Sequence, residues 1–376
     1  MGSSDLSASE RVILQAIWRN APITRSDLAE RTGFGVGSIT RLVRELEERE
    51  LVMDVVERTG ARGQPSRPVS LRPDGAFACG VYFSHSYVDV GLIDLAGELR
   101  SSERIRIARP EPETIAEAAR AGMLRQVAAL EVPLDRIVGV GFALPGDFGD
   151  TTAALRAHAY FPELLNRDLA AEFGARMPVP VFVENDAASA ALGERVNGIG
   201  RRLDSFVLVH IGHGVGGGLV LGRRLFRGSH GNAGVIGVLY PPDRERPSGQ
   251  DLFETLERSG VAVGDFDTLE QLDPATCPPL RQWLDRAGAQ LASGIHTAAR
   301  LLDPDAIILG GRLPPHLLAA LLAAIDLDAA FHDRAVLPVP QVALSSLGPY
   351  AGVIGAASIC MFATFFDERP SRAVSP

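Results

Sequence analysis

The sequence predicts an α/β protein with a separate helical segment in front of it. Three observations carry this prediction. From about residue 76 onward, short apolar strands alternate with helices, and several of these strands end in glycine or polar residues. The first 50 residues instead contain three short helical patterns. Alternating strands and helices are typical of α/β domains, whose ligands bind at strand ends.

The N-terminal segment is predicted to contain three helices between Glu10 and Glu50. The second helix opens at Thr24, a favourable N-cap, and stops at Gly33. The apolar faces are formed by Val12, Ile13, Ala16 and Ile17 in the first helix, and by Val36, Ile39, Leu42, Val43 and Leu46 in the third.

The polar face of the third helix carries small and basic residues: Gly37, Ser38, Thr40, Arg41 and Arg44. A short helix, a tight turn with glycine and a second helix of this kind form a helix-turn-helix. Ser38, Thr40 and Arg41 could then reach bases or phosphates in a major groove, and Arg44 a phosphate. The alternative is a three-helix bundle whose polar face is simply solvated.

Two short strands are predicted after the helices, at residues 51–56 and 69–71, with a loop rich in glycine, proline and arginine between them. This pattern indicates a β-wing and therefore a winged helix-turn-helix. Arg62 and Gln64 at its tip would fit the negative, narrow minor groove of DNA. The alternative for the tip is a solvated turn.

Composition excludes several kinds of enzyme. All 37 basic residues are arginine, so a lysine-dependent phosphate loop, a protein-kinase strand lysine and Schiff-base chemistry are absent. The net charge is −9, but acidic and basic residues are nearly balanced up to Gly75, which makes the N-terminal segment the place for a phosphate-facing surface.

Other features of the sequence suggest where the protein works. The three cysteines are widely spaced, and neither a signal peptide nor an apolar stretch of membrane-spanning length is apparent. We therefore expect no membrane partner and a cytoplasmic location.

Two local features in the body of the chain could carry chemistry. The tripeptide Glu184-Asn185-Asp186 lies between a strand and a helix, where carboxylate and amide groups could bind paired hydroxyls and Asp186 could act as a general base. The alternative is helix capping. The second feature is the glycine-rich run Gly212–Gly218, which could cradle phosphate or could be a tight turn.

The order of these motifs resembles the ROK family of repressors, open reading frames and kinases across nearly the whole chain. The resemblance rests on Gly-x-x-x-Pro-Gly-Asp at 141–147, on the run Glu184–Glu194, on the glycine-rich segment from Ile211 to Gly218, and on Gly231–Gly237 and Leu302–Gly311. It implies an actin-like, hexokinase-like ATPase fold of two lobes with a sugar between them. In DNA-binding members, a sugar or a partner protein changes operator affinity.

Several departures from the family pattern argue against kinase activity. Family kinases carry an Asp-x-Gly-Gly-Thr phosphate loop, whereas this chain has Tyr82-Phe83-Ser84-His85-Ser86 at the matching positions. His213 replaces a hydroxyl residue in the second phosphate loop, of which Gly212, Gly214 and Gly216 would be vestiges. Asp186, the family's base, is kept. We expect no catalytic residues and no cofactor.

The family's zinc ligands are also missing, so we expect no structural zinc. Val238 stands where the family has a histidine, and residues 241–250 contain no cysteine. Val235 replaces a glutamate that contacts sugar hydroxyls, which makes that wall less polar. His210, His213 and His230 are close in sequence, but exposed or hydrogen-bonded histidines are a simpler interpretation than a metal site.

We therefore predict a DNA-binding transcriptional regulator, in particular a repressor, that recognises a double-stranded operator. Gly146, Asn185 and Asp186 would hold a sugar or derivative, and two-fold operators would be bound by a homodimer or a dimer of dimers. The rival hypotheses are an ATP-dependent sugar kinase and a DNA-binding protein whose lobes serve only as a scaffold for dimers. The predicted domains are residues 1–74, a first lobe at 75–186 completed by helix 352–366, and a second lobe at 187–351.

Overall fold

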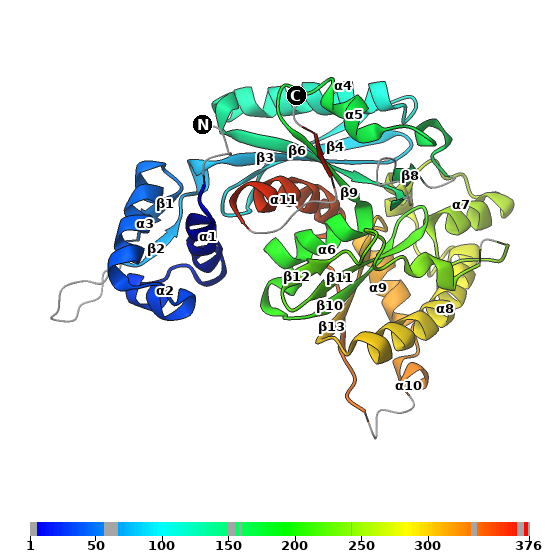
Figure 1. The fold of residues 1–376 in the computed structure, drawn as a ribbon. Helices are drawn as coiled ribbons and strands as arrows, with labels where there is room; N and C mark the ends of the chain where they lie inside the picture. Colours follow the sequence, from blue (N-terminus) through cyan, green and yellow to red (C-terminus); the bar gives the residue numbers. More distant parts are fainter. Residues whose placement is uncertain are drawn as a thin grey trace.

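The computed structural model describes residues 6–55, 67–148, 155–157, 160–241, 243–331, 337–366 and 372–374. The N-terminal segment stands at one side of the molecule, and the rest of the chain forms two α/β units, each built on one large sheet (Figure 1). An α/β fold with an N-terminal winged helix-turn-helix is what the sequence predicted.

The N-terminal segment consists of helices α1 (Ala8–Asn20), α2 (Arg25–Thr32) and α3 (Val36–Glu48), followed by the antiparallel strands β1 (Val52–Asp54) and β2 (Val69–Leu71). Thr24 caps α2 as predicted, and Gly33 ends it with a left-handed backbone of φ 73°. The prediction that Val12 and Val36 belong to the buried apolar faces is wrong, because their side chains are 39% and 59% exposed.

The first large sheet has the strand order β15-β9-β6-β3-β4-β5. Its strands are β3 (Phe77–Phe83), β4 (Tyr87–Asp94), β5 (Leu99–Arg106), β6 (Ile137–Leu144), β9 (Val181–Asn185) and β15 (Arg372–Val374). Strands β3, β6 and β9 are parallel, and β4 and β5 are antiparallel neighbours. Strand β5 was not predicted from the sequence, because every second residue of it is exposed and the strand therefore contains no apolar run.

Helices α4 (Pro112–Ala129) and α5 (Leu169–Gly174) lie above this sheet in Figure 1, and α11 (Ala351–Phe365) lies below it. The short strands β7 (Gly146–Phe148) and β8 (Leu155–Ala157) form a separate antiparallel pair. The core between the sheet and α4 is apolar and includes Phe83, Met123 and Phe142.

The second large sheet has the order β12-β11-β10-β13-β14. Its strands are β10 (Phe206–Ile211), β11 (Val215–Leu221), β12 (Arg224–Phe226), β13 (Ala306–Gly311) and β14 (Gln341–Leu344). The sequence suggested that the glycine run at 212–218 could be one tight turn, and the structure corrects this interpretation. Gly216, Gly217 and Gly218 pair with β10 inside β11, and only residues 212–214 form the turn.

Helix α6 (Asp186–Asn197) faces α11 between the two sheets, and α7 (Gly249–Arg258), α8 (Pro278–Leu302), α9 (Pro315–Ala323) and α10 (Leu327–Ala330) belong to the second unit (Figure 1). Helices α7 and α9 and strand β14 were not predicted from the sequence. The predicted domain limits at residues 74, 186 and 351 remain predictions.

Helix α11 packs so closely on its neighbours that only glycine fits at the contacts. A Cβ atom at Gly355 would lie 1.6 Å from the carbonyl oxygen of Ser189 in α6. A Cβ at Gly80 of β3 would lie 1.9 Å from the Val353 oxygen, and one at Gly141 of β6 would lie 1.8 Å from the Ala356 oxygen. The helix is thus in backbone contact with both the first sheet and α6.

One sequence expectation about membranes needs correction. The segment Gly348–Phe365 is 18 residues long and apolar enough, by length and composition, to cross a membrane. However, 78% of it is buried inside the protein, as suits the central helix of a folded core.

Replacing Gly355 by alanine should destabilise this core. Because the new methyl group has no room beside the α6 backbone, we expect the free energy of unfolding to fall by about 1–3 kcal/mol. Thermal melting followed by circular dichroism would measure this. Gly264→Ala is the matched control, since its Cβ would meet only Thr268 at an ordinary 3.8 Å. Equal melting temperatures of the two variants would contradict the close packing.

Candidate functional site

The polar face of α3 lies on the outside of the molecule. The side chains that the sequence predicted to contact DNA there are all exposed: Ser38, Thr40, Arg41 and Arg44. Arg41 pairs with Glu45 at 2.7 Å and Arg44 with Glu48 at 3.0 Å along the helix. Exposed pairs of this kind contribute little, so both guanidinium groups can exchange their carboxylates for phosphate.

The predicted wing tip, with Arg62 and Gln64, lies outside the described residues. The base of the wing is anchored by Arg25 at the start of α2. Its Nη2 atom lies 2.9 Å from carboxylate oxygens of both Glu47 in α3 and Asp54 in β1. Arg25 therefore links all three elements, a role that the sequence analysis did not assign.

A cleft opens where strands of the two large sheets end. The sugar-binding and phosphate-loop residues predicted from sequence all line it: Gly146, Asn185, Asp186, Gly212, Gly214 and Gly216. They lie together because β6, β9 and β10 end on this side. The cleft is narrow, with a cavity volume of about 70 Å³. Val235 is part of its wall.

Asn185 has a structural role at this position. Its Oδ1 accepts a hydrogen bond from the Ala188 N–H at 3.0 Å, which caps α6, and its Nδ2 donates to the Gly146 carbonyl at 2.8 Å. The capping alternative therefore applies to Asn185. The same two bonds fix the direction of the β9–α6 junction and hold the Gly146 turn against it.

Asp186 is the first residue of α6, and its carboxylate accepts a hydrogen bond from the Ala187 N–H at 2.8 Å. Its other oxygen lies 4.0 Å from Nε2 of His210. Asp147 faces the same cleft, where partial desolvation, and then the charge of Asp186, raise its pKa. Two carboxyl groups near each other suit hydrogen bonds to a polyol.

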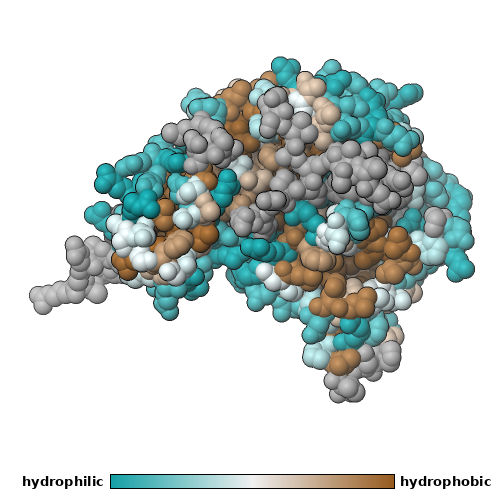
Figure 2. All heavy atoms as spheres, viewed as in Figure 1, coloured by the Kyte–Doolittle hydropathy of each residue, from teal (hydrophilic) through white to brown (hydrophobic). Residues whose placement is uncertain are grey.

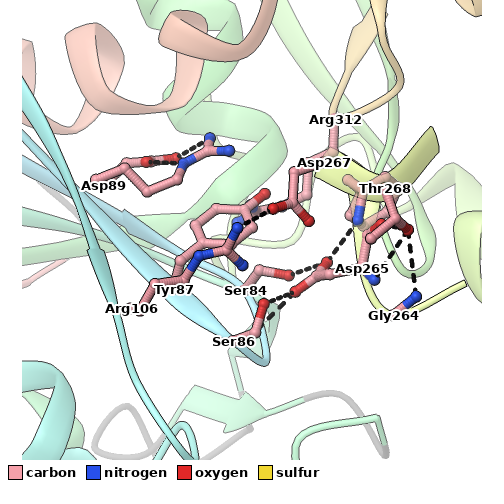
Figure 3. A network of polar contacts seen from close by, with 12 residues as sticks. Ser84, Ser86, Tyr87, Asp89, Arg106, Gly264, Asp265, Asp267, Thr268 and Arg312 are labelled. Atoms are coloured by element: carbon pink, nitrogen blue, oxygen red, sulfur yellow. Dashed lines mark hydrogen bonds and ion pairs between the residues drawn. The ribbon is translucent and has the colours of Figure 1, made fainter. Parts of the chain in front are cut away.

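The other end of the cleft is closed by a polar network between the two units (Figure 3). Asp265 accepts hydrogen bonds from the hydroxyls of Ser84 and Ser86, at 2.8 and 2.7 Å. Burial alone would raise the pKa of Asp265, but the hydrogen bonds from Ser86, the Phe266 N–H and Ser84, and then the charge of Arg312, outweigh it and lower that pKa. The carboxylate is thus held charged at neutral pH.

Two histidine rings fill the space next to this network. Nε2 of His213, in the turn after β10, lies 2.9 Å from the Ser84 hydroxyl and 3.1 Å from Nδ1 of His85. The His85 ring stacks on Phe161, with ring centroids 4.4 Å apart. The β3–β4 turn and the 212–214 turn, which the sequence resemblance matched to two phosphate loops, are therefore joined by side chains.

Arg312 is a buried cation that the sequence analysis missed. Its guanidinium lies 3.6 Å from the centre of the Tyr82 ring and donates to the Tyr87 hydroxyl at 3.2 Å and to the Phe83 carbonyl. Arg312 follows Gly310-Gly311 at the carboxyl end of a buried strand. That position was the available signal, because ligand-facing residues of α/β proteins gather there.

His210 is buried beneath the cleft. Its Nε2 lies 2.8 Å from the Tyr82 hydroxyl, and its Nδ1 has no hydrogen-bond partner in the described part of the chain. Burial, and then the nearby charge of Arg312, lower the pKa of His210 to about 3. The ring is therefore neutral in the folded protein at physiological pH. No cluster of three or more potential metal ligands occurs among the described residues.

His210 should make stability depend on pH. Below the ordinary histidine pKa of about 6.5, His210 is protonated in the unfolded chain, whereas in the folded chain it stays neutral down to about pH 3. We expect His210 to remove about 2 kcal/mol of stability between pH 6.5 and pH 5. In denaturant titrations His210→Gln should flatten this dependence, and His230→Gln, at an exposed site, should not. Parallel pH profiles for all three proteins would refute the assignment.

Comparison with known proteins agrees with this architecture. The ROK family model matches residues 79–251, and a model described as winged helix-turn-helix DNA-binding matches residues 6–53. The uncharacterized protein y4fQ of Sinorhizobium fredii is 38% identical over 363 residues, which cover 96% of this chain and 93% of that protein.

More distant relatives have described roles. The DNA-binding transcriptional dual regulator NagC of Escherichia coli K12 is 23% identical, over 93% of this chain and 94% of its own. Among solved structures, a ROK family transcriptional regulator, a homolog of the E. coli MLC protein, superposes with a TM-score of 0.71 at 22% identity, covering 95% of this chain and 96% of that one. This chain, with its N-terminal winged helix-turn-helix and two α/β units around a cleft, is a member of the ROK family.

Proposed function

We propose that this protein is a DNA-binding transcriptional regulator, acting as a repressor, whose effector is a sugar or sugar derivative bound between the two lobes. The observation that carries the proposal is the combination of two features. The polar face of α3 is exposed, and one end of the ROK cleft, here called the phosphate end, is occupied by the side chains of Ser84, His85 and His213. NagC, which matches along nearly the whole chain, is a transcriptional regulator. A cytoplasmic location follows, because operator DNA lies there.

The DNA would be read by α3. With Ser38, Thr40 and Arg41 near the helix start, the helix can enter a major groove, while Arg44 binds a phosphate. The N-terminus of α3 supports this orientation, because no side chain caps its first-turn N–H groups and such groups favour phosphate. We propose that Arg62 and Gln64 of the wing reach the minor groove, and that a dimer binds a two-fold operator.

The effector would bind at the other end of the cleft, next to Gly146, Asn185 and Asp186. Asp186 can accept hydrogen bonds from hydroxyls, and Val235 adds an apolar contact to the wall of the cleft. Because the cavity is narrow, binding would require the lobes to move apart, as in hinge motions around ligands. Helix α6 begins at this site and ends beside the N-terminal segment, where Arg195 stacks over Trp18 of α1 at 5.3 Å. A change at Asp186 would thus reach the DNA-binding domain through one rigid helix.

The sugar-kinase alternative is disfavoured by the contents of the phosphate end. A nucleotide needs backbone N–H groups that can approach its phosphates, yet the His213 side chain is hydrogen-bonded there to both Ser84 and His85. The buried Asp265 adds a negative charge beside them, which would repel a polyphosphate. We propose that Asp186 no longer serves as a catalytic base.

Arg41 offers the test of DNA recognition. We expect Arg41→Gln to weaken binding to an operator fragment roughly tenfold or more, because one charge-assisted contact is lost. Fluorescence anisotropy with fragments from the protein's own genome, at fixed salt, measures this. Arg120→Gln, an exposed arginine of α4, is the control of equal charge. If the wild-type protein binds no fragment specifically, the regulator proposal fails.

Asp186 tests the effector site and the absence of catalysis together. In a thermal-shift screen with a panel of sugars, at least one should raise the melting temperature of the wild type. That shift should vanish in Asp186→Asn and persist in Asp285→Asn, which changes an exposed residue of α8. A coupled ADP-release assay should show no turnover.

Two outcomes would support the alternative functions, a sugar kinase or a scaffold for dimers. Robust ADP release with a sugar that is abolished by Asp186→Ala would establish a kinase. Specific operator binding without a shift by any sugar or derivative would favour the dimer scaffold.

A further inference from the structure

A second cavity, of about 290 Å³, lies where the winged helix-turn-helix meets the rest of the chain. Its lining includes Trp18 and Arg19 from the last turn of α1, Arg195 from the end of α6, Arg201 and Arg202 from the 3₁₀ helix at Ile199–Arg202, and Arg223 from the turn after β11. The surface between the N-terminal segment and the second unit is mainly hydrophilic in Figure 2. This cavity is separate from the sugar cleft, with which it shares no lining residue.

The lining is far more basic than the composition would produce by chance. Arginine makes up 37 of the 376 residues of the protein but five of the eight residues around this cavity. Arg223 has an acidic partner, Asp204, at 3.1 Å. Within the described chain, neither Arg201 nor Arg202 forms an ion pair with a carboxylate. Like charges gathered in this way repel one another unless an anion joins them.

Two of the arginines are held in place before any ligand arrives. Arg195 is only 4% exposed, and its guanidinium lies 5.3 Å from the Trp18 ring centre and 4.7 Å from that of Phe362. Arg223 donates to the Arg201 carbonyl at 3.3 Å, which ties the β11–β12 turn to the 3₁₀ helix. A rigid guanidinium loses little entropy on binding, and its planar donor pair matches a phosphate in two places.

We propose that this cavity is a binding site for a small phosphorylated compound, recognised through its phosphate groups. A concave pocket with an aromatic wall and five arginines suits a compact polyanion better than the convex backbone of a DNA duplex. Because α1 and the second unit both supply arginines, a bound phosphate would join them and favour the arrangement of the DNA-binding domain seen here. The site would act independently of a sugar at Asp186.

Inorganic pyrophosphate is the probe for a direct test. Isothermal titration calorimetry of the full chain at fixed ionic strength should show saturable binding of one equivalent. Arg201→Gln/Arg202→Gln should weaken that affinity at least tenfold, because two charge-assisted contacts are lost. The control is Arg120→Gln/Arg281→Gln, which removes the same charge from exposed positions on α4 and α8. Equal weakening in both double variants, or no saturable binding by the wild type, would overturn the proposal.

Tryptophan fluorescence locates the bound anion. The protein has two tryptophans: Trp18 lines this cavity, whereas Trp283 is fully buried in the second unit and donates to Asp251 at 3.0 Å. Pyrophosphate should change the emission of the wild type. In Trp18→Phe the change should vanish while calorimetric binding persists. A signal that remains in Trp18→Phe would place the anion elsewhere.

Duplex DNA is the competing source of phosphate. If Arg201→Gln/Arg202→Gln weakens binding of a non-specific duplex in the absence of pyrophosphate, and the wild type does not bind pyrophosphate, the arginines contact the DNA backbone and the proposal fails. If pyrophosphate binds even though no operator is recognised, the phosphate site stands and only the regulator proposal is lost. The two proposals can therefore fail separately.

Discussion

The architecture depends on one steric constraint, the backbone contact of α11 with the structures on both sides of it. Gly80 and Gly141 let the first sheet approach the helix, and Gly355 lets α6 approach it from the other side. Side chains at these points would separate the layers, because protein interiors are too densely packed to absorb an extra methyl group. The contact explains why an almost wholly apolar helix lies inside the fold.

The position of α6 follows from this packing and relates the cleft to the DNA-binding domain. The helix begins at Asp186 in the cleft and carries Arg195 near its end, beside Trp18. Trp18 in turn packs edge-on against Phe362 of α11, with ring centroids 5.1 Å apart. Arg11 of α1 donates to the Thr364 carbonyl of α11. The DNA-binding domain thus rests on the two helices that form the centre of the fold.

The two ends of the cleft differ in chemistry because different elements supply them. At one end, Asp147 and Asp186 follow strands of the first unit and face the cavity. At the other end, Ser84 and Ser86 of the first unit bind Asp265 of the second (Figure 3). His213 lies 2.9 Å from the Ser84 hydroxyl. Hydrogen bonds that would otherwise be available to a ligand are used here to join the lobes, which makes this end of the cleft a structural contact.

The sequence by itself determined the helix-turn-helix, the order of strands and helices, and the glycine and polar motifs at strand ends, because apolar periodicity, caps and motif spacing are local properties. It missed β5, whose residues alternate between exposed and half-buried, and it extended the glycine turn into β11. Only the tertiary structure decided that Arg312, Asp265 and His213 of the second unit meet residues of the β3–β4 region of the first unit across the cleft. It also decided that five arginines from three regions of the chain share one cavity. Such contacts join residues far apart in sequence, and no local pattern records them.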